Sequence, residues 1–274
     1  MAETTSEIEN YKSLAKELRR DVLDMIYRTK SPHIGSSFSM VELLVVLYFR
    51  ILSLEPGKSS DNNRDRFLLS KGHGCPALFA VLAKKGFLTK EELDSFALNG
   101  NCLGQHPNRD VSKGIEITSG SLGHGLSQGA GMALAAKYDK ANYRVFVFLG
   151  DGELNEGSVW EAALFASHHK LDNLTVIVDR NRLQALGSGS EIMNLEPLAK
   201  KWASFNWAVK EIDGHNFEEI IEALEKIPLE KGKPTCIIAN TIKGKGVSFM
   251  ENDFRWHDKF PDETEYQKAL NELK

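Results

Sequence analysis

Two polar side chains, Asp151 and Asn181, each follow a short run of apolar residues. Asp151 lies in GDGELNEG (150–157), directly after YRVFVFL (143–149), and Asn181 comes shortly after LTVIVD (174–179). The thirty residues from 151 to 181 are enough for a crossover helix and a second, parallel strand. We therefore expect the two side chains at neighbouring strand tips, on the edge of the sheet where ligands collect in open parallel sheets.

The chemistry that fits this pair is the binding of a phosphate through a metal ion. Backbone N–H groups at a helix start attract a phosphate, whereas the carboxylate of Asp151 repels it. A hard divalent cation between them removes the conflict. The Asp151 carboxylate, the Asn181 amide oxygen and a main-chain carbonyl such as that of Leu183 leave octahedral positions for phosphate oxygens and water, as Mg²⁺ prefers. Taken singly, each residue is better explained by an ordinary turn.

A histidine between two glycines follows another apolar run. In LLSKGHG (68–74), His73 is flanked by Gly72 and Gly74. Glycine marks turns more often than ligand sites, so a solvated histidine at a strand end is the simpler interpretation. If a ligand passes close over this turn, the missing Cβ atoms leave room for it and the histidine faces the ligand.

The elements that must position these residues alternate along the second half of the chain. We expect strands over 143–149, 174–179, 207–212 and 235–241, and helices over 157–168, 195–203 and 217–227. Strands that are apolar on both faces and separated by helices predict a parallel sheet covered on both sides. We find no repeat or linker and expect one α/β domain over 1–274, with a C-terminal arm from about 241 that ends in a short helix.

The first half of the chain carries helix signals. Apolar residues recur at helical spacing over 11–29, which predicts an amphipathic helix. Two capping-box patterns predict further helix starts, one from Ser39 with Glu42 and one from Thr89 with Glu92.

The composition excludes several classes of function. The chain has 274 residues, 42% of them apolar, and 34 basic against 38 acidic side chains give a formal charge of −4. This balance speaks against general affinity for nucleic acid or anionic membrane. The longest apolar run, 43–49, is too short to cross a bilayer. The acidic N-terminus and three cysteines without CxxC spacing predict a cytoplasmic protein without a disulfide framework or zinc site.

Taken together, the motifs resemble the transketolases. An asparagine thirty residues after GDG is similar to the thiamine diphosphate signature, and further motifs occur in the family's order. They are SPHIGSS (31–37), NRDRFLLSKGHG (63–74), LGQHP (103–107), TSGSLGHGLSQGAGMA (118–133), GDGELNEGSVWEA (150–162), DRNRL (179–183) and KGKG (243–246) followed by WH (256–257). The resemblance covers most of the chain and implies the diphosphate-binding domain of the thiamine diphosphate-binding fold.

The resemblance assigns roles to individual residues. It implies that Asp151, Asn181 and the Leu183 carbonyl ligate the metal, Mg²⁺ or in its place Ca²⁺ or Mn²⁺. The implied contacts to thiamine diphosphate are His73, Gly120, Ser121, Leu122, Gly152, Glu153, Asn181, Lys243 and His257. Without the resemblance, a solvated surface lysine is the better interpretation of Lys243.

The catalytic set implied by the resemblance consists of four histidines and a glutamate: His33, His73, His106, His257 and Glu156. The histidines hydrogen-bond the donor ketose and help to move protons, and Glu156 meets a glutamate across a subunit boundary. Glu156 is equally consistent with a carboxylate placed in the first turn of a helix. We expect no catalytic role for His168, His169 or His215, and His124 stands where the family often has glutamine. Ser36 resembles a residue near the substrate phosphate path.

Two features depart from the family pattern. In NRLQALG, Gln184 and Ala185 stand where some members carry a cofactor-contacting side chain, so that contact is in doubt. The second departure is length, because the pyrimidine-binding half is missing, and with it the glutamate that promotes ionisation of the cofactor. The resemblance therefore implies the N-terminal subunit of a split transketolase, active only with a C-terminal partner, in a heterotetramer with two copies of each.

The expected reaction is transfer of a two-carbon ketol unit from a ketose phosphate to an aldose phosphate. Three other enzymes remain open: a sugar-specific relative, half of a deoxyxylulose-phosphate synthase, and an E1 component of a 2-oxoacid dehydrogenase. LSKGHG, LGQHP, and Lys243 fourteen residues before His257 favour transketolase over the E1 component. A non-catalytic binding remnant is a further alternative, which the intact set of polar residues disfavours.

Overall fold

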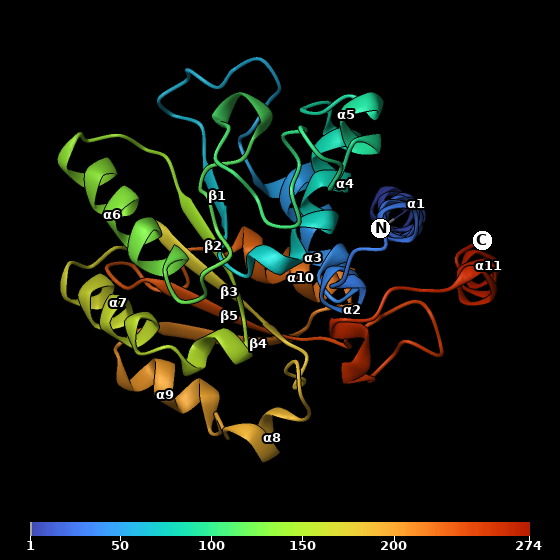
Figure 1. The fold of residues 1–274 in the computed structure, drawn as a ribbon. Helices are drawn as coiled ribbons and strands as arrows, with labels where there is room; N and C mark the ends of the chain where they lie inside the picture. The colour runs from blue at the N-terminus through green and yellow to red at the C-terminus, as the bar shows by residue number, and fades with distance from the viewer. Residues whose placement is uncertain (1) are drawn as a thin grey trace.

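A parallel β-sheet forms the centre of the computed structural model, which describes residues 2–274 and the side chains from Ser6 onward. Its strands are β1 (Arg66–Leu69), β2 (Val145–Gly150), β3 (Leu174–Arg180), β4 (Ala208–Asp213) and β5 (Thr235–Asn240). The spatial order is β1-β2-β3-β5-β4, and all neighbours run parallel (Figure 1). All the strands therefore end at the same edge of the sheet.

Helices cover both faces of the sheet. On one face lie α6 (Gly125–Tyr138), α7 (Gly157–His168) and α9 (Leu198–Ser204), and on the other α1 (Ala2–Thr29), α3 (Val41–Val46), α4 (Cys75–Lys85) and α10 (Phe217–Glu225). Along β2, Val145 and Val147 pack toward the first group, whereas Phe146 and Phe148 pack toward the second. This alternation follows from the twofold period of a strand.

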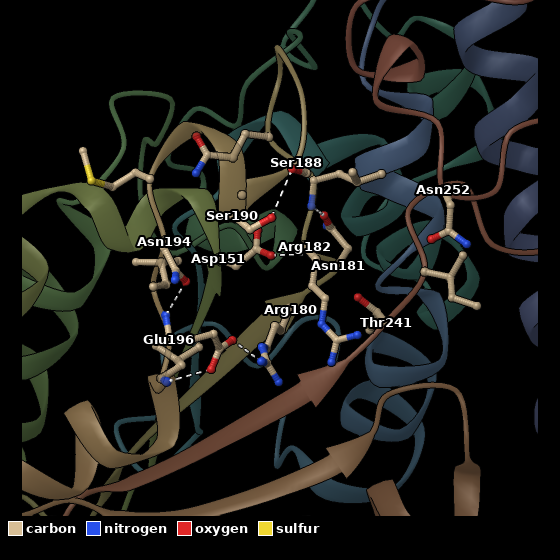
Figure 2. A pocket seen from close by; sticks show the side chains of 17 residues that line it. Asp151, Arg180, Asn181, Arg182, Ser188, Ser190, Asn194, Glu196, Thr241 and Asn252 are labelled. Carbon is tan, nitrogen blue, oxygen red and sulfur yellow. Dashed lines mark hydrogen bonds and ion pairs between the residues drawn. The ribbon is translucent and has the colours of Figure 1, made fainter.

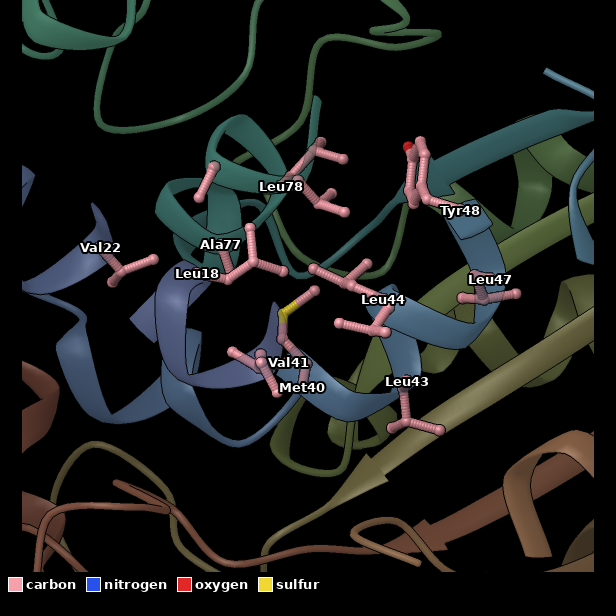
Figure 3. Close-up of a cluster of buried hydrophobic side chains, with 14 of the residues drawn as sticks. Leu18, Val22, Met40, Val41, Leu43, Leu44, Leu47, Tyr48, Ala77 and Leu78 are labelled. Carbon is pink, nitrogen blue, oxygen red and sulfur yellow. The ribbon is translucent and has the colours of Figure 1, made fainter. Parts of the chain in front are cut away.

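The larger core lies between α1, α3, α4 and the sheet. Figure 3 shows Leu18 and Val22 of α1 near Val41 and Leu44 of α3 and Ala77 of α4. Shorter segments complete the chain: α2 (Ile34–Phe38), η1 (Leu47–Ile51), η2 (Gly72–Gly74), α5 (Lys90–Asp94), η3 (Val111–Lys113), η4 (Gly152–Asn155), α8 (Gly189–Ile192), η5 (Phe254–His257) and α11 (Glu263–Glu272). Within residues 2–274, no helix is both long and apolar enough to cross a membrane.

The predicted α/β class is confirmed, and the predicted strands agree with β2 to β5 to within about two residues. The helix predicted over 157–168 is α7, and the one predicted over 11–29 is the C-terminal part of α1. The C-terminal arm returns to the N-terminal helix through α11, where Tyr266 stacks on Tyr27 with 4.1 Å between ring centroids.

One of the two capping predictions is wrong. Thr89 and Glu92 form the expected capping box of α5. Ser39 does not cap α3, which begins at Val41 after Met40. The Ser39 hydroxyl donates to Asp179 at 2.6 Å, and Glu42 pairs with Arg19 at 2.8 Å. A buried carboxylate far along the chain therefore takes the hydroxyl that the local pattern assigns to the helix.

Helix α6 packs closely on the sheet because it has a glycine at the contact. A Cβ placed on Gly129 would lie 2.4 Å from Cγ2 of Val147, whereas one on Gly131 would meet nothing within 4 Å. We expect G129A to lower the free energy of unfolding by about 1–3 kcal/mol through overpacking. The matched variant G131A should leave it unchanged or raise it by about 0.5–1 kcal/mol. Urea denaturation of both variants measures the difference, and equal stabilities would contradict this account.

Candidate active site

Two adjoining hollows lie at the carboxyl edge of the sheet. The smaller, about 190 Å³, is lined by Ser36, Lys71, His73, Leu122, Gly150, Asp151, Gly152, Glu153, Asn181, Leu183, Gln184, Ala185, Lys243 and His257. The larger, about 580 Å³, is lined mainly by the segment 180–198 and shares Asp151, Asn181, Leu183 and Gln184 with the smaller hollow (Figure 2). The smaller hollow gathers the titratable side chains, and we take it as the candidate active site.

The ends of β2 and β3 bring Asp151 and the turn at Asn181 together, as the spacing predicts. Gly150 of β2 pairs with Asp179 of β3. The residues that follow these two positions therefore lie next to each other where the strands end. Oδ2 of Asp151 accepts a hydrogen bond from the backbone N–H of Arg182 at 2.6 Å (Figure 2). Oδ1 accepts from the backbone N–H of Gly152 at 2.8 Å. Oδ1 of Asn181 accepts from the Leu183 N–H at 3.1 Å.

This edge of the sheet is suited to a cation. Burial, followed by the charge of nearby Asp179, raises the pKa of Asp151 to about 6. A divalent ion would offset that charge repulsion and hold the carboxylate ionised. Each Asp151 oxygen accepts one backbone hydrogen bond and keeps a free lone pair. A carboxylate, the Asn181 amide oxygen and the Leu183 carbonyl are the oxygen donors that a hard divalent ion takes, so these residues fit the expected metal.

Lys243 is a buried cation, not a solvated surface lysine. It is 1% exposed, and its ammonium lies 3.2 Å from Nδ1 of His257. Burial, followed by the charge of Lys71, lowers the pKa of Lys243 to about 8. Among the side chains described, those from Ser6 onward, no carboxylate lies within ion-pair distance of its ammonium. A buried ammonium without a carboxylate favours an anionic ligand, and a diphosphate fits that requirement.

Four histidines from distant parts of the chain meet beside Lys243. The ring centroid of His33 lies 5.4 Å from that of His73, 5.8 Å from His106 and 5.1 Å from His257, and His73 lies 5.2 Å from His257. Burial is the largest cause of the lowered pKa of each of the four rings. Neighbouring positive charge lowers the pKa further, to about 3 for His33 and about 4 for His257. Both rings are therefore neutral at pH 7, and each can donate one hydrogen bond and accept another.

These shifts predict a loss of stability in mild acid. In the unfolded chain His33 and His257 take up protons as the pH falls below about 6.5, whereas in the folded chain they do so only near about 3 and 4. The unfolded state then binds more protons, so the free energy of unfolding falls from about pH 6.5 downward. We expect the double variant H33N/H257N to lose less stability than wild type between pH 7 and pH 5 in urea titrations. Equal losses in both proteins would contradict the shifts.

The segment that carries Gly120, Ser121 and Leu122 lies against the turn at His73. Gly120 has φ +147°, and a Cβ there would lie 3.1 Å from the His106 ring. Leu122 reaches the smaller hollow, while Ser121 is exposed. The expectation that a ligand fills the space beside both glycines of GHG is wrong. A Cβ on Gly72 would meet the Gly120 backbone nitrogen at 2.8 Å, and one on Gly74 would meet Sδ of Met40 at 2.9 Å.

The two acidic residues after Gly152 differ in environment. Glu153 is buried, and its carboxylate accepts hydrogen bonds from the Ser70 hydroxyl and from the backbone of Gly123 and Gly150, the latter two at 2.9 and 3.1 Å. Glu153 thus links three segments of the site by hydrogen bonds. Part of the residue also lines the smaller hollow. Glu156 is exposed at the start of α7 and makes no side-chain capping bond there.

The remaining predicted residues divide between the site and the rest of the molecule. Ser36 is buried, with Oγ 3.5 Å from Nδ1 of His257. His215 is structural, because Nε2 accepts from the Ile242 N–H at 2.9 Å and Nδ1 bonds Glu42 at 3.0 Å. The other three histidines lie away from the smaller hollow: His124 at the start of α6, and His168 and His169 at the end of α7.

Sequence reasoning left several residues of the site without a role. Lys71 and Asp179 form a buried ion pair below the strand tips. A lysine directly after LLS and an aspartate at the end of LTVIV could have indicated such a pair, because charges beside buried strands need partners. Gln184 lines both hollows, and its Nε2 is buried with no hydrogen-bond partner in the described part of the chain. Ala185, one place later, lines the smaller hollow.

The chain is similar to the members of a known family. Residues 10–271 match the family described as "Transketolase, thiamine diphosphate binding domain". A protein of Phocaeicola vulgatus named as a subunit of apulose-4-phosphate transketolase is 42% identical over 267 residues, which cover 97% of this chain and 95% of that protein. The 6-deoxy-6-sulfo-D-fructose transketolase subunit SqwG of Clostridium sp. is 43% identical over 259 residues, or 94% of each chain.

A solved structure gives the same fold. The transketolase of Campylobacter jejuni superimposes with a TM-score of 0.89 at 30% sequence identity. The match covers 96% of this chain and 42% of that one. The chain thus spans less than half of that transketolase, although it spans nearly all of the two subunits that it resembles.

Proposed function

The chain belongs to the transketolase family, and on that basis we propose that it is the N-terminal subunit of a split transketolase. With a C-terminal, pyrimidine-binding subunit it transfers a two-carbon ketol unit from a ketose phosphate to an aldose phosphate. The observation that carries this proposal is the hollow at the strand tips, where the oxygens of Asp151 and Asn181 lie near a buried ammonium and neutral imidazoles. Metal and diphosphate require that combination.

In this proposal the chain holds Mg²⁺ and thiamine diphosphate. Asp151, Asn181 and the Leu183 carbonyl hold the metal, and Lys243 with Gly152 receives the diphosphate. Thiamine diphosphate, when bound, supplies the carbanion stabilisation that ketol transfer needs. The remaining contacts are Gly120, Ser121, Leu122, Glu153, His73 and His257.

The histidines act on the sugar. Because His33, His73, His106 and His257 are held neutral by burial, each can bind a sugar hydroxyl without adding positive charge next to Lys243. Each can also accept a proton at one ring nitrogen while donating one from the other. We assign them to orienting the donor ketose and moving protons to and from its hydroxyl groups.

A partner protein completes the site in this proposal. The chain covers nearly all of the two relatives named as transketolase subunits, but only 42% of the Campylobacter enzyme. Residues 1–274 would then form one diphosphate-binding domain with a C-terminal arm from about 241. We propose a cytoplasmic heterotetramer with two copies of each subunit, in which exposed Glu156 faces the partner and links paired sites.

The relatives favour a specialised sugar substrate. One relative is named for apulose 4-phosphate and the other for 6-deoxy-6-sulfo-D-fructose. The two names differ in the sugar while both describe transketolase subunits. We therefore propose that the donor is a ketose phosphate and that its sugar need not be a pentose.

The test is co-expression with a C-terminal transketolase subunit encoded nearby, followed by ketol-transfer assays. With thiamine diphosphate, Mg²⁺ and a panel of ketose phosphates, we expect the complex to be active and either polypeptide by itself to be inactive. Activity of this chain alone would contradict the shared site. Reduction of a lipoyl domain by the complex, without ketol transfer, would instead identify a 2-oxoacid dehydrogenase component.

A further inference from the structure

We propose that Asp179 is a positioning residue, which fixes the side-chain amide of Asn181 so that its oxygen is available to the metal. This inference rests on the proposed function, because it concerns the metal site described there. It gives a role to a fully buried carboxylate that contacts neither hollow.

Asp179 is the point where four segments of the site are joined. It is 0% exposed at the end of β3. Its carboxylate accepts hydrogen bonds from the Ser39 hydroxyl at 2.6 Å and from Nδ2 of Asn181 at 3.4 Å. It also accepts from the Lys71 ammonium and the Thr241 hydroxyl. These donors come from the α2–α3 turn, the turn after β3, the turn after β1 and the segment after β5.

The contact with Asn181 decides which way the amide faces. An ionised carboxylate can only accept hydrogen bonds, so the Asn181 atom that faces it must be the NH₂ group. The amide oxygen is then turned away from Asp179 and accepts from the Leu183 N–H at 3.1 Å. A flipped amide would place two oxygens face to face and would turn NH₂ toward the metal. Asp179 therefore selects the orientation in which Asn181 can be a ligand.

Lys71 and the hydroxyl groups keep Asp179 ionised in the interior. The Lys71 ammonium forms an ion pair with the Asp179 carboxylate, and the Ser39 and Thr241 hydroxyls donate hydrogen bonds to it, so its surroundings favour the charged form. Lys71 in turn donates to the Ser36 carbonyl at 2.8 Å. The ion pair thus has all the features of a structural element, and the experiment must separate that role from positioning.

The experiment replaces the whole ion pair with apolar residues, so that no buried charge is left alone. The double variant K71M/D179L keeps volume at both positions, and such exchanges of a buried pair are often neutral for stability. Mn²⁺ is titrated into the complex of this chain with its C-terminal subunit at fixed thiamine diphosphate. Electron paramagnetic resonance measures the free ion, and a titration without protein gives the Mn²⁺ that thiamine diphosphate chelates by itself. Calorimetric unfolding of the same samples reports whether the fold is kept.

If Asp179 positions Asn181, K71M/D179L binds Mn²⁺ at least about 10-fold more weakly, as for other groups that orient a metal ligand. N181A should weaken Mn²⁺ binding by a similar factor. Adding N181A to K71M/D179L should weaken it little further, because Asp179 acts through Asn181. S39A, which removes one donor but keeps both charges, serves as the control and should bind nearly as wild type does. If K71M/D179L fails to fold, K71M/D179N is measured in its place, with the same direction expected.

Three outcomes separate the two proposals. Wild-type affinity in a folded double variant would overturn the role of Asp179 and leave the proposed function intact. A second outcome is that the losses of Mn²⁺ affinity in K71M/D179L and in N181A are additive when the variants are combined. The ion pair would then act independently of Asn181, which also overturns the inference. Failure of the wild-type complex to bind Mn²⁺ with thiamine diphosphate would contradict the metal site itself, and the inference would fall with it.

Discussion

Replacing Asp151 with asparagine should abolish metal-dependent cofactor binding without unfolding the chain. The substitution removes the carboxylate charge that attracts the ion, and we expect the affinity for Mn²⁺ in the presence of thiamine diphosphate to fall by more than about 100-fold. The new amide oxygen can still accept from the backbone N–H of Gly152 or Arg182, which Asp151 now bonds at 2.8 and 2.6 Å. The local turn therefore keeps one of its two anchors.

The stability of D151N should not fall together with its affinity for Mn²⁺. In the metal-free chain Asp151 is a buried carboxylate next to Asp179, and both burial and that charge disfavour its ionised form. Removing the charge relieves the repulsion, so the melting temperature without metal should stay equal or rise. D213N, at the exposed end of β4, is the matched control. It should change neither the affinity for Mn²⁺ nor the melting temperature. Wild-type Mn²⁺ affinity in D151N would exclude Asp151 as a ligand.

The meeting of Asp151 and Asn181 could be predicted from sequence because it depends on chain length and strand order. Two apolar runs joined by one helix become neighbouring parallel strands, and their tips then lie together. The histidine cluster is a different case. His33, His73, His106 and His257 leave four separate segments, and no periodicity in the sequence brings those segments together. Only the family resemblance indicated that they meet.

Local patterns also failed where a distant residue competes for the same group. Ser39 looks like a helix cap, but its hydroxyl bonds Asp179, which lies 140 residues along the chain. Sequence reasoning gives Lys71 no role in LLSKGHG, yet this residue is buried and forms an ion pair with the same carboxylate. Long-range electrostatics in the interior outweigh a cap worth about 1 kcal/mol. A charge beside a buried strand can indicate that it needs a partner, but the spacing of nearby residues does not say which distant residue that partner is.

Gly72 offers a second large effect, because it lets two backbone segments approach each other. A Cβ at this position would lie 2.8 Å from the Gly120 nitrogen and 2.9 Å from the Ser119 carbonyl carbon. Backbone atoms must move to admit it, and they belong to the loop that carries Leu122 into the smaller hollow. The tips of β2 and β3, which we propose hold the metal, are not among these contacts. G72A should therefore disturb Gly120, Ser121 and Leu122, which we propose lie against the aminopyrimidine ring of thiamine diphosphate, and spare the proposed metal site.

The size and specificity of this effect can be measured together. Overpacking costs about 1–3 kcal/mol, and about 1.4 kcal/mol corresponds to tenfold in affinity, so thiamine diphosphate with Mn²⁺ should bind G72A about 10-fold or more weakly. Inorganic pyrophosphate with Mn²⁺ lacks the ring and should bind G72A as it binds wild type, whereas D151N should lose both ligands. G157A, whose new Cβ meets nothing within 4 Å, is the matched control. If G72A weakened both ligands equally, the segment 119–122 would have no separate role in holding the ring.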